Sequence, residues 1–129
     1  MDVTILLKNI ATHISLNNEE EAYFVSFLQH RKIKKKHFLY QEGDINKFQA
    51  FVAEGCLRSY SIDKNGFEHV LQFAPPGWWI GDIQSIITQE PGTLYIDAVE
   101  DSEVLLLFKK DLEKIYTTVP KLERFFRIL

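Results

Sequence analysis

The sequence predicts a mainly β domain: a sandwich, jelly roll or barrel of short strands with helices on either side. Four of its six glycines recur every eleven or twelve residues, at Gly43, Gly55, Gly66 and Gly77. Turn signals at this spacing between short strands are typical of these three architectures. The segments between the glycines are rich in aromatic and β-branched residues, whereas both ends of the chain show helical periodicity. At 129 residues the chain fits a single domain with one core.

Apolar residues near helical spacing predict two helices within residues 3–30. They are Val3, Leu6, Leu7, Ile10 and Ile14 in the first helix, and Ala22, Phe24, Val25, Phe27 and Leu28 in the second. Asn17 or Asn18 precedes three glutamates, which indicates a helix start because an amide caps the first turn and acids favour the positive end of the helix dipole. The lysine-rich run 32–37 then predicts the start of an edge strand, since lysines there discourage pairing with other chains.

Strands are predicted over residues 48–53, 56–62 and 67–73. The stretch Asp63–Gly66 between the last two is a hairpin signal, because Asn-Gly tolerates the positive φ angles of a tight turn. Two prolines at 75 and 76 then end the ladder, since proline cannot donate a hydrogen bond. With further strands over 94–99 and 103–108, the roll is expected to span about residues 33–108.

Residues 109–129 predict two C-terminal helices. The first covers 109–118, and the second begins at Pro120, where the first turn of a helix accepts a missing amide hydrogen. An apolar surface on the second helix is formed by Phe125, Phe126, Ile128 and Leu129. Either this helix packs back on the roll, or it begins a long dimerisation helix that is truncated in this chain. We favour the second interpretation.

Composition and charge exclude several classes of function. A net charge of −3 argues against this chain alone binding nucleic acid, because such domains usually have a strongly basic face. No apolar run approaches the roughly 18 residues of a membrane span, and the N-terminus lacks signal-peptide features, so a cytoplasmic location is expected. The single cysteine, Cys56, excludes an internal disulfide and an iron–sulfur cluster and is expected to be a small buried hydrophobic residue.

The most informative residues are Gly81 and Asp82, which stand at a predicted strand-to-helix turn. A second turn at Gly92 and Thr93 follows about ten residues later. A glycine and a carboxylate in this arrangement are the layout of a phosphate-binding cassette. The helix start after Asp82 adds the amides of Ile83 and Gln84, and such amides form a ready anion site.

The order and spacing of these features resemble the cyclic-nucleotide-binding domain of the Crp/Fnr family of bacterial transcription regulators. The matching stretches are Glu42–Asp44, Val52–Gly55, Asp63–Gly66, Pro76–Asp82 and Ala98–Val104. The resemblance implies one domain over residues 1–129, a double-stranded β-helix, or jelly roll, with flanking helices. It also implies a ligand-sensing domain of a transcription regulator that forms a homodimer. DNA would be contacted only through a helix-turn-helix domain absent from this chain.

The resemblance assigns a role to each cassette residue. Gly81 matches the glycine that lets the backbone approach the ligand, Asp82 replaces a glutamate that binds the ribose hydroxyl, and Thr93 stands where a hydroxyl donates to the phosphate. Gly92 stands where the family has an arginine that clamps the cyclic phosphate. Because a guanidinium supplies both charge and geometry, we expect cyclic AMP to bind weakly or not at all, and we predict no cofactor. If Asp82 caps the following helix, its carboxylate also occupies the amides that a phosphate would use.

Another small-molecule effector could use the pocket. Leu71, Phe73 and Ala53, with the tryptophan pair at 78 and 79, would give an apolar lining if their side chains face inward, although they fit a core role equally well. The candidate ligand-binding residues are therefore Ala53, Leu71, Gly81, Asp82, Ile83, Gln84, Gly92 and Thr93.

No catalytic or metal-binding residues are predicted. The four histidines lie on different predicted elements and lack the His-x-His pattern of a cupin metal site. No nucleophile or nucleotide-phosphate motif occurs. A sensor is therefore favoured over an enzyme; the alternative is a stand-alone cupin-like small-molecule-binding protein or enzyme.

Overall fold

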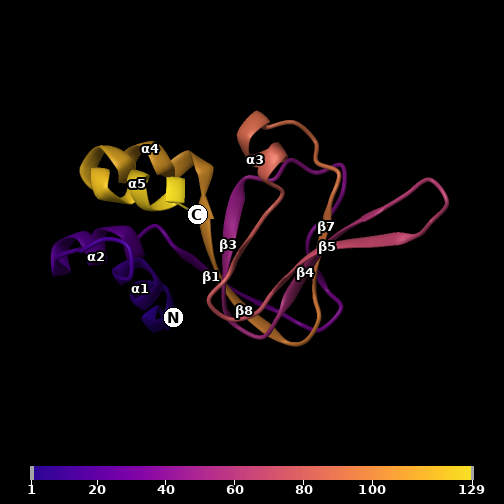
Figure 1. Cartoon of the computed structure of the whole chain (residues 1–129), viewed down its shortest axis with the longest axis horizontal. Helices are drawn as coiled ribbons and strands as arrows, with labels where there is room; N and C mark the ends of the chain where they lie inside the picture. The colour runs from indigo at the N-terminus through magenta and orange to yellow at the C-terminus, as the bar shows by residue number, and fades with distance from the viewer. Residues whose placement is uncertain (1, 129) are drawn as a thin grey trace.

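The computed structural model describes residues 2–128, and the side chains of residues 2–126. The helices are α1 (Thr4–Ala11), α2 (Asn18–Val25), α3 (Ile83–Thr88), α4 (Lys109–Thr118) and α5 (Pro120–Ile128). The strands are β1 (Gln29–Ile33), β2 (Phe38–Tyr40), β3 (Phe48–Glu54), β4 (Leu57–Ile62), β5 (Glu68–Ala74), β6 (Trp79–Ile80), β7 (Tyr95–Ala98) and β8 (Ser102–Phe108). Figure 1 shows α1, α2, α4 and α5 gathered beside a β-roll, with α3 at one end of the roll. Within residues 2–128, no helix is both long and apolar enough to cross a bilayer.

Two antiparallel sheets of four strands form the roll. One has the order β1-β8-β3-β6 and the other β2-β7-β4-β5. Buried apolar side chains from both sheets pack together between them, among them Ala50, Val52, Leu57, Ile80, Ile96, Ala98, Val104 and Leu106. Because successive side chains of a strand alternate between its two faces, the same strands also supply a second, outward-facing apolar surface. The expected mainly β jelly roll with flanking helices is therefore confirmed.

The helices cover the outer face of the first sheet. Phe51 of β3 and Leu105 of β8 form one buried cluster with residues of α1, α2, α4 and α5. Leu122 and Phe125 of α5 are fully buried in this cluster, and Phe126 packs against it. The apolar surface at Phe125 and Phe126 thus packs back within the chain, and this part of our preferred interpretation is corrected. The side chains of the other two predicted members, at positions 128 and 129, lie outside the described residues, and a longer dimerisation helix stays a prediction.

Residues 18–30 do not form one helix. α2 begins as predicted: Asn17 accepts a hydrogen bond from the backbone of Glu20 at 2.8 Å, and the Glu20 carboxylate accepts one from the backbone of Asn17 at 2.9 Å. It ends after eight residues, and the following segment forms β1, which pairs with β8 as an edge strand. The helical prediction was wrong for residues 26–30 because pairing with β8, far along the chain, determines their conformation. Glu103 of β8 lies 3.2 Å from His30 of β1.

Two turns differ in detail from the sequence-based prediction. The lysines at 34–36 lie in the turn between β1 and β2 and not in a strand, with Lys36 at φ 70°. The predicted hairpin turn between β4 and β5 is present, and Gly66 takes φ 85° and donates to the carbonyl of Asp63 at 3.0 Å. Asn65 does not take a positive φ. The turn is held by the Asp63 carboxylate, which accepts the amide hydrogens of Asn65 and Phe67 at 2.8 and 3.1 Å.

Candidate effector-binding site

The predicted cassette forms a single short helix between two strands. Two residues, Gly81 and Asp82, separate the end of β6 from the start of α3, and the last turn of α3 leads into the loop before β7. A Cβ at Gly81 would lie 2.8 Å from the side-chain oxygen of Gln49, so only glycine fits without displacement of that side chain. Gln89 ends the helix in a left-handed conformation, and its side-chain amide donates to the carbonyl of Ile86 at 2.9 Å.

The carboxylate of Asp82 binds both ends of the cassette. The residue is only 3% exposed and caps α3, where it accepts the amide hydrogen of Ser85 at 3.3 Å. The same carboxylate accepts the amides of Thr93 and Leu94 at 3.1 and 3.4 Å. Asp82 therefore caps the helix as expected, and it also binds backbone donors of the turn that precedes β7.

Asn46 and Ser85 fix the position of Asp82. The side-chain oxygen of Asn46 accepts the amide hydrogen of Asp82 at 2.8 Å. The hydroxyl of Ser85 accepts the amide hydrogen of Asn46 at 2.9 Å and donates to the carbonyl of Glu90 at 2.6 Å. Sequence reasoning missed both residues. Asn46 lies 36 positions from Asp82, and no local pattern signals such a contact.

Space, and not backbone conformation, requires glycine at position 92. Gly92 is not one of the glycines with a positive φ. A Cβ at this position would collide with the hydroxyl of Tyr40 and the carboxylate of Asp82. Tyr40 donates to the carbonyl of Asp44 at 2.7 Å, and burial raises the pKa of its phenol. The same carbonyl accepts the amide hydrogen of Gly92 at 3.0 Å, so the tyrosine occupies the space that a side chain at 92 would need.

Arg58 of β4 is engaged within the second sheet. Its guanidinium donates to both carboxylate oxygens of Asp97 on β7, at 2.8 and 3.2 Å, and lies 3.4 Å from Glu68. It also stands 4.2 Å above the ring of Tyr60. The hydrogen bonds to Asp97 raise the pKa of Arg58 above its ordinary value. Arg58 is therefore paired with carboxylates of its own sheet.

The remaining predicted site residues are dispersed. Ile83, Gln84 and Thr93 are exposed, and of these the Thr93 amide is used by Asp82. Ala53 is half-buried on β3. Leu71 is 63% exposed on β5, and Phe73 on the same strand is 56% exposed. These two side chains face solvent, because β5 is an edge strand without a covering layer. They therefore take neither of the two roles that the sequence left open for them, pocket lining or core.

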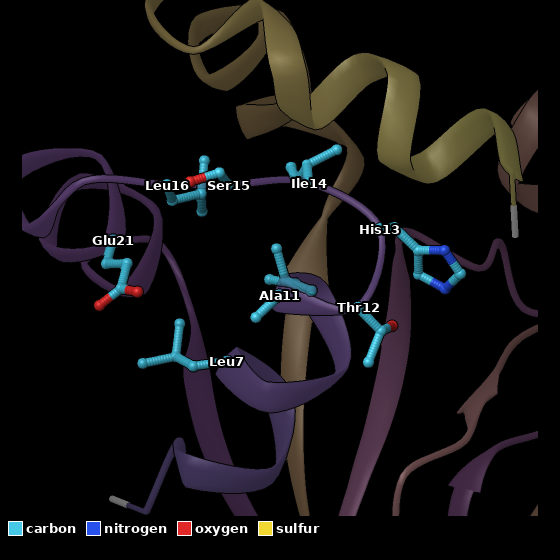
Figure 2. Close-up of a pocket in the computed structure, with 9 residues that line it drawn as sticks. Leu7, Ala11, Thr12, His13, Ile14, Ser15, Leu16 and Glu21 are labelled. Atoms are coloured by element: carbon cyan, nitrogen blue, oxygen red, sulfur yellow. The ribbon is translucent and has the colours of Figure 1, made fainter.

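Hollows of different size lie among the helices. A cavity of about 770 Å³ is bounded by α3, α4 and β6, with Trp79, Ile86 and Leu112 in its wall. A smaller hollow of about 310 Å³ lies where α1 ends, and Figure 2 shows Leu7, Ala11 and Ile14 around it with the ring of His13 turned away to one side. Its lining residues come from α1, α2 and the loop between them, away from the cassette.

The cysteine and the histidines do not gather into a site. Cys56 is half-buried, and burial raises the pKa of its thiol. His69 lies 2.8 Å from Asp63 in the hairpin. Among the residues whose side chains the structure describes, no three histidine, cysteine, aspartate or glutamate side chains are placed to hold a metal ion.

A two-sheet roll with a short capped helix between β6 and β7 defines a sensor module of the cyclic-nucleotide-binding type. The family model described as "Cyclic nucleotide-binding domain" matches residues 30–118. The chain therefore belongs to the cyclic nucleotide-binding domain family.

Individual relatives agree with this assignment. The chain is 28% identical over 102 residues to the cyclic AMP receptor protein of Thermus thermophilus, an alignment that covers 79% of this chain and 47% of that protein. The crystal structure of the Thermus thermophilus catabolite activator protein matches with a TM-score of 0.73 and 26% identity, over 88% of this chain and 56% of that one. The sensor domain of the transcriptional regulator DNR from Pseudomonas aeruginosa has the same fold, with a TM-score of 0.80 and 12% identity over 98% of this chain and 83% of that one. The resemblance to Crp/Fnr regulators is confirmed, and the chain spans about half the length of the curated relative.

Proposed function

We propose that this chain is the effector-sensing domain of a Crp/Fnr-like transcription regulator whose cassette does not bind cyclic AMP in the family manner. The observation that carries the proposal is the Asp82 carboxylate, which already accepts the amides of Ser85, Thr93 and Leu94. A phosphate at the cassette would have to displace this carboxylate or lie beside it. Two anions in one buried site repel each other, so neither arrangement is favourable without a cation.

The nearby cations do not reach the Asp82 carboxylate. Arg58, which could in principle replace the missing clamp, is held by Asp97 and Glu68. Lys109 reaches α3, but it binds the carbonyls of Ile86 and Ile87 at the far end of the helix from Asp82. Burying a phosphodiester without a paired cation costs several kcal/mol, to an order of magnitude.

A signal from the cassette would reach the C-terminal helices through Lys109. This residue begins α4, and its ammonium donates to the carbonyls of Ile86 and Ile87 at 2.8 and 2.9 Å. α4 leads directly into α5. An effector that favours one position of α3 would thereby favour one orientation of the helix pair, which is a population shift. If no effector exists, the domain is a constitutive dimerisation module.

Partners follow from this proposal. A homodimer is supported by the exposed apolar side chains of β5 and the loops on either side of it, namely Phe67, Leu71, Phe73 and Trp78. DNA would be bound by a helix-turn-helix domain outside this chain, in the cytoplasm. The candidate from another class is a stand-alone small-molecule-binding protein, which the 770 Å³ cavity favours. A longer open reading frame with a helix-turn-helix pattern would remove that candidate.

The test is isothermal titration calorimetry of the purified chain with cyclic AMP and cyclic GMP. We expect no saturable heat for either nucleotide. The variant Asp82→Ala is the matched comparison, because it frees the three amides while leaving Gly92 in place. Dissociation constants in the low micromolar range for the unaltered chain would overturn the proposal.

A further inference from the structure

We propose that the cavity between α3, α4 and β6 is a ligand site in its own right, and that it takes a small organic acid with a planar apolar body and a carboxylate. The cavity measures about 770 Å³, within the range of roughly 300 to 1,000 Å³ that is typical of small-molecule sites. It lies on the helix side of β6, and its lining includes Gly81 and Ile83, the two chain neighbours of Asp82. The site therefore adjoins the cassette, and its test with an organic acid is separate from the test of cyclic-nucleotide binding.

Unpartnered polar atoms are concentrated in this cavity. In the described part of the chain, three buried side-chain atoms lack a hydrogen-bond partner: Oδ1 of Asn9, Oε1 of Gln49 and Nε1 of Trp79. All three residues line the cavity. A buried polar atom without a partner costs about 1 to 3 kcal/mol, and folded proteins keep few of them. As placed, two of the three are acceptor oxygens and only the indole nitrogen is a donor, so the wall of this cavity holds polar groups of both kinds whose hydrogen bonds the chain does not supply.

One unpartnered donor and one cation favour an acceptor as the ligand's polar group. The indole nitrogen of Trp79 can only donate, and the amides of Asn9 and Gln49, whose oxygens are unpartnered as placed, can turn their NH₂ groups toward a ligand. Lys109 is the one charged residue among those that line the cavity, and no aspartate or glutamate is among them. Within residues 2–126, Lys109 forms no ion pair, and its hydrogen bonds go to backbone carbonyls. A carboxylate would satisfy the indole and neutralise this lysine.

The apolar side chains that line the cavity favour a ligand with a planar apolar body. Ile86, Leu112 and Phe126 line the cavity, and the Phe126 ring lies edge-on to the ring of Trp79 at 5.5 Å. Trp78 and Ile87 are also lining residues and are 56% and 68% exposed, which leaves an apolar mouth open to solvent. A flat ring can slide between such walls and stack on aromatic faces.

The test uses 2-naphthoate as the probe and the indole N–H signal of Trp79 in ¹H–¹⁵N NMR spectra as the readout. We expect a saturable shift of this signal at submillimolar to millimolar probe. The neutral analogue 2-naphthamide should bind about tenfold more weakly, which corresponds to about 1.4 kcal/mol. No saturable shift with 2-naphthoate at millimolar concentration would overturn the proposal and leave the cavity to water.

Matched variants locate the site. Lys109→Met keeps the apolar stem and removes the charge, so it should weaken 2-naphthoate about tenfold. Lys110→Met, one residue further on and outside the cavity lining, should leave binding unchanged. Leu112→Trp should block the cavity, whereas Leu71→Trp on the exposed face of β5 should not. Circular dichroism confirms that each variant is folded.

Two results would overturn particular parts of the proposal. Equal affinity of 2-naphthoate for Lys109→Met and for the unaltered chain would contradict an acid as the ligand. Binding that survives Leu112→Trp would place the probe elsewhere, for instance on β5. If Leu112→Trp does not fold, the comparison of 2-naphthoate with 2-naphthamide still decides whether charge matters, because it needs no substitution.

Discussion

The carboxylate of Asp82 accepts the backbone amide of Thr93 at 3.1 Å, across eleven positions of the chain. This hydrogen bond closes the cassette on itself, because Asp82 also caps the helix that begins at the next residue. The chain therefore supplies both the backbone amides of an anion site and the carboxylate that occupies them.

Asp82→Ala is expected to lower the free energy of unfolding by about 3 to 5 kcal/mol. The variant loses an N-cap, worth about 0.5 to 2 kcal/mol, and leaves the amides of Thr93 and Leu94 without their charged acceptor, at about 1.5 to 3 kcal/mol each before relaxation. Urea denaturation measures the difference. The control is Asp101→Ala, which removes an exposed carboxylate that accepts the Lys35 amide at 2.8 Å and should cost about 1 kcal/mol. Equal costs for the two variants would contradict a special role for Asp82.

Gly92→Ala is expected to cost about 1 to 3 kcal/mol, because a Cβ would collide with Tyr40 and Asp82. The cost should be smaller in a Tyr40→Phe background, since that substitution removes the hydroxyl in the way. Denaturant unfolding of both single variants and the double variant measures the coupling. Strictly additive costs would show that the two positions do not compete for space.

Gly92→Arg should not restore cyclic AMP binding. The arginine has no room while Tyr40 and Asp82 keep their positions, so the variant is expected to be destabilised and to give no saturable heat in calorimetry. Adding Tyr40→Phe and Asp82→Ala clears the space and provides the comparison. Cyclic AMP binding by Gly92→Arg alone would mean that the cassette rearranges easily.

Arg58→Met should lower stability by about 2 to 3 kcal/mol. The partner carboxylate of Asp97 is only 11% exposed and would be left unpaired, although the quarter-exposed arginine places the cost below that of a fully buried pair. The double variant with Asp97→Asn should recover much of this loss, which a double-mutant cycle measures. Arg31→Met, at an exposed position in β1, serves as the control and should change stability by about 0.5 kcal/mol or less. No recovery in the double variant would contradict the pairing.

The β4–β5 turn should loosen in acid. The hydrogen bond from His69 and the backbone amide of Phe67 lower the pKa of Asp63 below its ordinary value of 3.8. A depressed folded pKa means that the stabilisation is fully present above pH 3.8 and is lost as pH falls through the lower, folded value. NMR titration of the Asn65 and Phe67 amide shifts should give a midpoint below 3.8. His69→Ala should move the midpoint upward, and an unchanged midpoint would rule out the histidine as the main cause.

Local patterns predicted most of the fold. The glycine spacing located β3, β4 and β5 to within one residue at their starts and ends, and Asn17 with the following glutamates located the start of α2. β1 was missed because Gln29–Ile33 becomes a strand only through β8, which the local sequence does not contain. The same limit applies at the site. The capping role of Asp82 follows from its position before a helix, whereas Tyr40, Asn46 and Lys109 reach the cassette from distant segments and carry no motif.

The exposed residues of β5 had no reliable signal either. Leu71 and Phe73 are apolar, as the residues of an inward-facing strand are. However, β5 is the edge strand of the second sheet, and no helix covers these two side chains. Alternation of residue types identifies a strand and cannot say whether another layer covers it.

Asp82 can be regarded as a tethered ligand. Because the carboxylate is covalently attached to the amides it binds, its effective concentration is set by the fold and does not follow the supply of any metabolite. At any cellular concentration, a free phosphate has to compete with the attached carboxylate for the same amides. Under the proposed function the chain's own carboxylate keeps the cassette occupied, and an effector would act on α3 from its other side, where the helix lines the 770 Å³ cavity.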